Sequence, residues 1–154
     1  ARFMFLSRKS DSHLDFDLDA VKQKSMDNPV YYVQYAHARV KSLFAKAAER
    51  GFSPAPATPE LLARCDTAED LELLKLLEQY PDTLAAAARS FSPHLVSFYL
   101  RDLAGKLHRY YTANPVLTAG DDALVAARLH LLDAVAAVVK NGLGLLGVSA
   151  PEKM

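Results

Sequence analysis

Tyr32, Tyr35 and Arg39 are the side chains whose types and spacing are best suited to binding a ligand. They belong to a predicted amphipathic helix over residues 29–50, and at roughly 100° per residue they fall within about 60° of one another. Lys46 lies in the same sector. The stripe that should face the core is centred roughly 140° away and consists of Val30, Val33, His37, Val40 and Phe44. The sequence therefore predicts two tyrosines and an arginine on the side of the helix that faces away from its own core.

Two kinds of role suit aromatic rings on such a face. Bases of single-stranded RNA stack on tyrosine rings and guanidinium planes, each base contributing about 1–3 kcal/mol, and arginine also reaches phosphate groups. Alternatively, the face packs against another helix of the bundle or against another part of a larger protein, with the tyrosine hydroxyls bonded at its edge. A protein-interaction domain that docks a partner helix on Tyr32 and Tyr35 is a related alternative. The spacing leaves these interpretations open.

The elements that must position this face are predicted to be helices. Asn28-Pro29 is typical of a helix start, with an N-cap followed by proline at the first helical position, and Gly51 should end that helix. Further start signals lie at Thr58-Pro59, Thr67, Ser92-Pro93, and Asp121 or Asp122. The predicted fold class is all-α, a helical bundle.

Two residues predict where helices are interrupted. Pro81 is expected to end or kink the helix that begins at Thr67, with helix resuming over residues 82–89. Asn141-Gly142 is expected to end the last helix.

A short extended segment near the N-terminus is the one exception to helix. Apolar and acidic residues alternate there, which is typical of a strand with one buried side: Leu14, Asp15, Phe16, Asp17, Leu18 and Asp19. A calcium-binding loop would need glycine at its sixth position and glutamate at its twelfth, where this chain has Ala20 and Met26. A calcium site is therefore not expected.

Composition narrows the classes of function. Lysine plus arginine and aspartate plus glutamate are 18 each among 154 residues, so any nucleic-acid site must be local rather than a polybasic arm. A single cysteine, Cys65, cannot form an internal disulfide. The most apolar stretch, residues 124–139, contains too many charges for a membrane span. We expect no membrane partner, a cytoplasmic location, and a chain cut from a longer protein.

Catalytic and metal-binding patterns are not evident, so no catalytic or metal-ligating residue is expected. The histidines lack the Glu-x-x-His and His-x-x-x-His spacings of bundle metal sites, and no glycine-framed nucleophile occurs. His37 is expected to be a hydrogen-bonded core residue. Arg128 falls inside the apolar stripe of the last helix, which predicts a carboxylate partner, with Asp102 as the candidate.

A modest basic run follows on the helix after Pro93: Arg101, Lys106 and Arg109, together with His108. These residues either form a solvated face or contact an RNA backbone, and the second interpretation predicts salt-dependent binding.

Three segments resemble arginyl-tRNA synthetases. Residues 28–39, NPVYYVQYAHAR, are similar to the signature helix of that family, and residues 141–154 resemble the close of its chain. Residues 2–6 together with 14–17 resemble the stretch between its catalytic and anticodon-binding domains. The resemblance implies that residues 1–27 are the end of the catalytic domain or a connecting segment, and that residues 28–154 are a helical anticodon-binding domain.

The resemblance also implies a ligand and a role for particular residues. Tyr32, Tyr35 and Arg39 match positions that contact the anticodon loop of tRNA(Arg), Met154 matches a terminal methionine close to the anticodon, and Tyr111 matches a further aromatic contact. Gln34 is a candidate for reading the central base. The family ligates arginine to its tRNA with ATP and magnesium, but its His-x-Gly-His and Lys-Met-Ser-Lys type motifs are absent here. This chain alone is therefore expected to be inactive, to need no cofactor, and to act together with the catalytic domain of the same chain.

Overall fold

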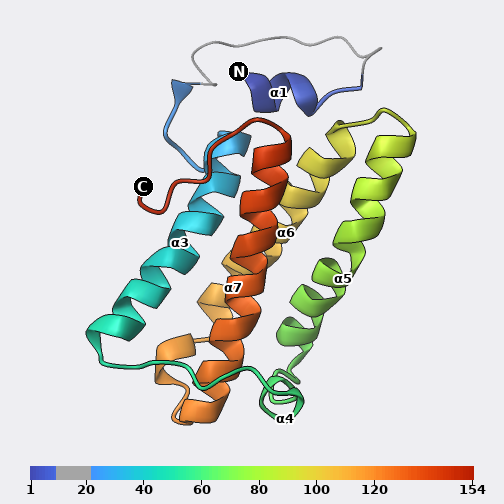
Figure 1. The fold of residues 1–154 in the computed structure, drawn as a ribbon. Coiled ribbons are helices and arrows are strands. Elements are labelled where there is room, and N and C mark those ends of the chain that lie inside the picture. Colours follow the sequence, from blue (N-terminus) through green and yellow to red (C-terminus); the bar gives the residue numbers. More distant parts are fainter. Residues whose placement is uncertain (10–21) are drawn as a thin grey trace.

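A computed structural model describes residues 1–9 and 22–154, and the elements that it describes there are helices (Figure 1). They are α1 (Arg2–Leu6), α3 (Pro29–Glu49), α4 (Pro59–Leu62), α5 (Ala68–Arg89), α6 (His94–Ala113), the 3₁₀ helix η1 (Val116–Thr118) and α7 (Asp122–Leu145). The all-α prediction is confirmed. The predicted extended segment at residues 14–18 lies outside the described residues.

Three of the long helices begin where the sequence places a capping side chain. The Asn28 side chain accepts a hydrogen bond from the Val30 amide at 3.2 Å. Thr67 and Asp70 cap each other reciprocally at the start of α5. The Asp121 carboxylate accepts from two amides in the first turn of α7. Each of these bonds satisfies a backbone donor that a helix start leaves without a partner.

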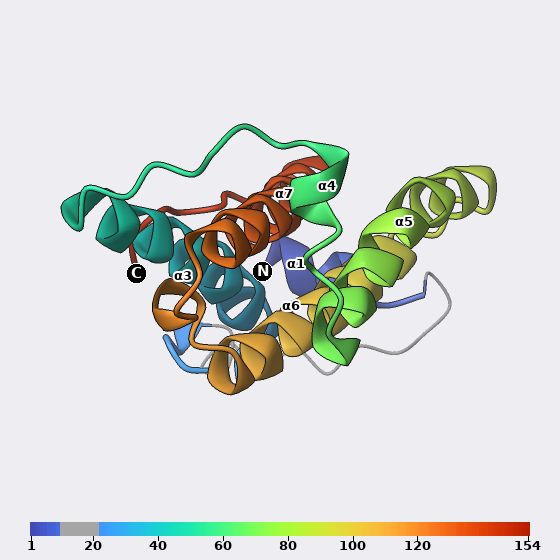
Figure 2. The same cartoon turned by 90° about the horizontal axis from the view of Figure 1, so that it is seen from below.

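Four long helices, α3, α5, α6 and α7, form the bundle (Figures 1 and 2). α6 and α7 contact each other and both remaining long helices, so they form its centre. α4 and η1 pack on α7, and α1 lies across one end of the bundle, against α3 and α6. Phe3 of α1 is 1% exposed and belongs to the common core. No helix in the described part of the chain is long and apolar enough to cross a membrane.

Leucines are the most frequent of the large, fully buried side chains that pack between the long helices. The fully buried side chains include Leu73, Leu100, Leu103, Leu107, Leu129 and Leu132. Burying a leucine side chain contributes about 1.5–3 kcal/mol relative to exposing it. Cys65 is a buried free thiol, and burial raises its pKa to about 11, so the thiol stays protonated at neutral pH.

Neither Pro81 nor Gly142 ends a helix, so these two predicted helix ends are wrong, whereas the predicted helix over residues 82–89 is confirmed. α5 continues through Pro81, which is exposed, so that its ring lies on the outside of the helix. α7 continues past Gly142 to Leu145, and the left-handed residue that follows its end is Gly147, with φ 66°. Gly142 instead lets two helices approach closely: a Cβ there would lie 2.8 Å from Leu100 Cδ2 of α6.

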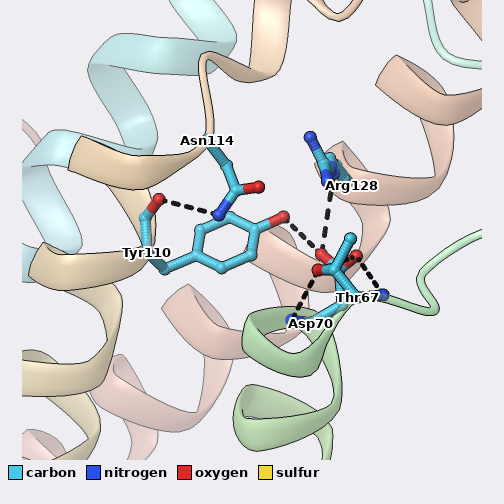
Figure 3. Close-up of polar contacts among 5 residues, drawn as sticks. All are labelled: Thr67, Asp70, Tyr110, Asn114 and Arg128. Carbon is cyan, nitrogen blue, oxygen red and sulfur yellow. Dashed lines mark hydrogen bonds and ion pairs between the residues drawn. The ribbon is translucent and has the colours of Figure 1, made fainter.

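Arg128 does have a carboxylate partner, but it is Asp70 rather than the predicted Asp102 (Figure 3). Arg128 Nε lies 3.6 Å from Asp70 Oδ1, and both side chains are buried. Asp70 Oδ1 also accepts a 2.6 Å hydrogen bond from the Tyr110 hydroxyl. Asp102 is exposed on α6. One carboxylate therefore joins the start of α5 to both α6 and α7.

Candidate nucleic-acid interface

The α3–α6 face is the surface formed by Tyr32, Tyr35 and Arg39 of α3 with His108 and Tyr111 of α6. All five residues are half-buried. The core side of α3 carries Val33, Ala36, His37 and Val40 instead, as the helical periodicity predicts, whereas Val30 and Phe44 are only partly buried. Tyr35 and Arg39 therefore lie outside the core, Tyr32 packs against it, and all three contact α6 instead of standing free in solvent.

His108 lies at the centre of this face. Its ring packs edge-on against Tyr32, with ring centres 4.7 Å apart, and is tilted by 35° against the ring of Tyr35, with 5.6 Å between centres. In the sequence, His108 stands out only as part of a basic run. The pattern that could have identified it is its spacing from Tyr111, three residues apart on one helix face, which matches the spacing of Tyr32 and Tyr35 on α3.

The hydrogen bonds of His108 define its tautomer. Arg39 Nη1 donates to His108 Nδ1 at 3.4 Å, and because a guanidinium can only donate, Nδ1 carries no proton. Nε2 then carries the proton and donates to the Tyr32 carbonyl oxygen, also at 3.4 Å. Burial lowers the pKa of His108, and the nearby Arg39 charge lowers it further despite the Tyr32 bond. His108 is therefore neutral at pH 7.

Arg39 connects the aromatic rings of both helices. Its Cζ lies 4.0 Å from the centre of the Tyr111 ring and 5.8 Å from that of Tyr35, within the range of cation–π attraction. Tyr31 extends the aromatic surface, because its ring is parallel to that of Tyr35 to within 5°, at 6.4 Å between centres. The result is a continuous group of rings around one guanidinium.

A hollow lies at each end of the α3–α6 face. The first, of about 450 Å³, is lined by Tyr32, Gly105, Arg101 and Arg109 among others. A Cβ at position 105 would come within 3.3 Å of the Tyr32 hydroxyl, so glycine leaves room for that ring. The second hollow, of about 190 Å³, is lined by a group that includes Lys46, Arg50, Tyr111 and Asn114. Cationic side chains thus flank the aromatic rings at both ends, and in the first hollow Asp27 and Asp102 lie beside the two arginines.

The predicted basic run is divided between two surfaces. Arg101 and Arg109 line the first hollow together with Tyr32. Lys106 instead forms an ion pair with Glu72 of α5, with 2.9 Å between Nζ and Oε2, and this contact lowers the pKa of Glu72. Two of the three predicted backbone contacts therefore adjoin the α3–α6 face, and Lys106 makes its contact with α5.

The C-terminal tail returns along α3 after Gly147. The Gln34 amide donates to the Ser149 carbonyl oxygen at 2.8 Å, and His37 Nδ1 donates to the Pro151 carbonyl oxygen at 2.8 Å. His37 is 1% exposed, and its expected role as a hydrogen-bonded core residue is confirmed. Met154 is exposed, and Figures 1 and 2 both show the C-terminal end beside α3. Gln34 is thus engaged with the tail.

Metal-ligating side chains do not gather anywhere in the described part of the chain: no group of three or more histidine, cysteine, aspartate or glutamate residues there could hold an ion. The α3–α6 face combines stacking surfaces, a guanidinium and flanking positive charge. Such a surface can bind nucleotides by stacking and charge.

A helical bundle with this surface is of the anticodon-binding type. The model of the DALR anticodon binding domain family matches residues 33–154, and the chain belongs to that family.

Curated relatives and solved structures agree with this assignment. An arginine–tRNA ligase of Solidesulfovibrio magneticus is 82% identical over the whole chain, and one of Nitratidesulfovibrio vulgaris is 61% identical. The chain spans 28% of the length of each. A solved structure from Campylobacter jejuni has a TM-score of 0.82 at 30% identity, covering 99% of this chain and 32% of that one. For the Thermus thermophilus arginyl-tRNA synthetase the TM-score is 0.76 at 32% identity, covering 99% and 26%.

Proposed function

We propose that this domain recognises the anticodon loop of tRNA(Arg) through the α3–α6 face. The observation that carries the proposal is the group of rings around Arg39, with a hollow lined by cationic side chains at each end. Unpaired bases would stack on Tyr35 and Tyr32, while Arg39 would contact a base edge or phosphate. Tyr111 holds the Arg39 guanidinium in place, and Met154 at the end of the tail would add a further contact.

Contacts with the phosphate backbone of the RNA are assigned to the basic residues of α6 that adjoin this face. Arg101 and Arg109 are exposed beside Tyr32 and could reach the phosphates of a loop or stem bound there. Lys106 is not assigned this role, because it forms an ion pair with Glu72 of α5, whereas Arg109 lines both the hollow beside that pair and the one beside Tyr32. Since the chain has no net charge, these local cations must supply the electrostatic part of the affinity.

The genetic code suggests how one domain could serve every arginine isoacceptor. All arginine codons have guanine in the middle, so all tRNA(Arg) anticodons have cytosine at their centre. A site that reads the pairing edge of this cytosine selects them together. Stacking then supplies affinity, and contacts to the base edge supply identity.

A binding assay with two transcripts tests the proposal. The chain is titrated with tRNA(Arg) and with a transcript that differs only at the central anticodon base. We expect at least tenfold tighter binding of the first, since a mismatched edge contact leaves polar groups unpaired. Equal affinity for both transcripts would refute anticodon recognition. Binding of a helical peptide on the Tyr32 and Tyr35 rings, without RNA binding, would favour the protein-interaction alternative, which the family assignment does not favour.

The longer protein to which this domain would belong is proposed to be a cytoplasmic arginine–tRNA ligase. Residues 1–27 would form its connecting segment, with the catalytic domain as a partner in the same chain. ATP and magnesium would be bound by that domain, because the His-x-Gly-His and Lys-Met-Ser-Lys type motifs of the resemblance do not occur in this sequence. The isolated chain is therefore expected to bind RNA without forming an arginyl-adenylate.

A further inference from the structure

The C-terminal tail is attached to α3 by two side chains that belong neither to the tail nor to the α3–α6 face. Gly147, with φ 66°, turns the chain back after α7, and the Val148 amide donates to the Leu143 carbonyl oxygen at 2.8 Å. Gln34 and His37 then bind the carbonyl oxygens of Ser149 and Pro151. Both bonds are made to backbone carbonyls, and the side chains of Val148 and Ala150 pack against the core beside them.

The spacing of the two bonds aligns the tail with the helix. Gln34 and His37 are separated by about 4.5 Å along α3, and Ser149 and Pro151 by about 6.5 Å in extended chain. The tail therefore runs in the same direction as α3 over this stretch. His37 is buried and its Nδ1 must carry the proton, because the Pro151 carbonyl oxygen can only accept.

The attached tail borders the aromatic surface on the side opposite α6. Around α3, at roughly 100° per residue, the side chains follow in the order His37, Gln34, Tyr31, Tyr35, Arg39. The first two hold the tail, and Arg39 contacts α6 through His108. Tyr31 and Tyr35 thus lie between the tail on one flank and α6 on the other.

We propose that Gln34 and His37 are positioning residues that hold the C-terminal tail as the second wall of the RNA-binding surface. This inference rests on the proposed function, since the tail matters to RNA only if RNA binds between the two walls. It also gives Gln34 a role other than base reading, because its side-chain nitrogen holds the tail. Because the tail is held on this path, Met154 would lie beside the bound loop.

Substitutions that remove a donor while preserving shape test the attachment itself. In His37→Phe and Gln34→Met, we expect the amides of residues 149, 150 and 152–154 to become mobile, as measured by the ¹H–¹⁵N nuclear Overhauser effect in the free protein. His37→Asn keeps a donor near the position of Nδ1 and should restore order. His130→Phe is the matched control, because His130 bonds the Ala55 carbonyl oxygen at 2.8 Å by the same chemistry in a different segment. A tail as rigid in both His37→Phe and Gln34→Met as in the unmodified chain would overturn the proposal.

Deletion of residues 149–154 tests whether the attachment acts on RNA through the tail. We expect His37→Phe and Gln34→Met each to lower affinity for tRNA(Arg) roughly tenfold, and to have no further effect once the tail is deleted. His130→Phe should leave affinity unchanged. Equal losses with and without the tail would show that the side chains act through the fold, and would overturn the proposal. The mobility measurement needs no RNA, so failure of the attachment is distinguishable from failure of tRNA(Arg) recognition.

Discussion

The guanidinium of Arg39 lies over the ring of Tyr111, with 4.0 Å between Cζ and the ring centre. This contact crosses from α3 to α6 and, together with the hydrogen bond to His108, orients the charge at the end of a flexible side chain. An arginine held in this way loses less conformational entropy when it binds RNA.

Arg39 and Tyr111 should therefore be coupled in RNA binding. We expect Arg39→Ala to lower affinity for tRNA(Arg) at least tenfold, and Tyr111→Leu to lower it several-fold. In the Arg39→Ala background, Tyr111→Leu should lower affinity markedly less than it does in the unmodified chain, because the guanidinium that Tyr111 orients is absent. Affinities of the four proteins by filter binding measure the coupling. Lys75→Ala on α5 is the control, and strict additivity would contradict the orienting role of Tyr111.

The protonation of His108 should depend on Arg39. Burial and the Arg39 charge lower the pKa of His108 below its usual 6.5, so NMR titration should show it neutral at pH 7. Arg39→Met should raise that pKa, whereas Lys41→Met, which removes an ion pair with Asp133, should not. Because the unfolded chain takes up this proton at higher pH than the folded chain, stability should fall as pH drops below about 6.5. A pKa unchanged by Arg39→Met would contradict the contact.

Salt dependence should separate the two surfaces of α6. Arg109→Gln removes a cation beside Tyr32 and should reduce the slope of log affinity against log salt by about 1, through one fewer released counterion. Lys106→Gln removes an equal charge on the same helix, but one that is paired with Glu72, and should leave the slope nearly unchanged. The slopes come from titrations with tRNA(Arg) at several salt concentrations. A larger effect from Lys106 would place the RNA on the α5 side instead.

Removal of the Asp70 carboxylate should be strongly destabilising. Asp70→Ala leaves Arg128 buried without its counter-charge, and takes a hydrogen-bond partner from Tyr110. We expect the free energy of unfolding to fall by about 3–5 kcal/mol, as measured by urea denaturation. Glu69 lies in the same helical turn and is exposed, so Glu69→Ala should change the free energy of unfolding by less than about 0.5 kcal/mol. A small loss for Asp70→Ala would show that the carboxylate is not essential to the bundle.

Phe91 offers a stabilising substitution. It has a positive φ of 52° in the turn between α5 and α6, a conformation that costs a non-glycine residue about 1–2 kcal/mol, and it is 93% exposed. Phe91→Gly should raise the melting temperature by about 1–3 °C. Phe91→Ala removes the same exposed ring but keeps a Cβ, so it should not give this gain. Equal melting temperatures for the two variants would exclude backbone strain as the cause.

Local signals in the sequence predict much of this fold. Asn28, Thr67 and Asp121 each mark a helix start, because the capping bond lies within three residues of the cap. Helical periodicity likewise separates the core side of α3 from the side that carries Tyr32, Tyr35 and Arg39. These are interactions within one helix, which spacing alone can describe.

Contacts between helices cannot be predicted from the spacing of residues within one helix. Arg128 needed a carboxylate, but the choice of Asp70 over Asp102 depends on the first turn of α5 lying beside α7. Glycine is a residue type that often ends a helix, yet Gly142 lies within α7 and allows α6 to pack closely against it. His108 is the clearest case, since its importance comes entirely from residues of α3.

The Arg39–His108 contact joins residues 69 positions apart, so the α3–α6 face exists only when both helices have docked. A ligand of this face therefore binds the native chain and not the denatured one. RNA at about 100 times its dissociation constant would add roughly 2.7 kcal/mol to the folding equilibrium. Bound RNA would thus protect the domain against thermal unfolding and proteolysis. The domain would therefore unfold and be cleaved most readily when RNA is scarce.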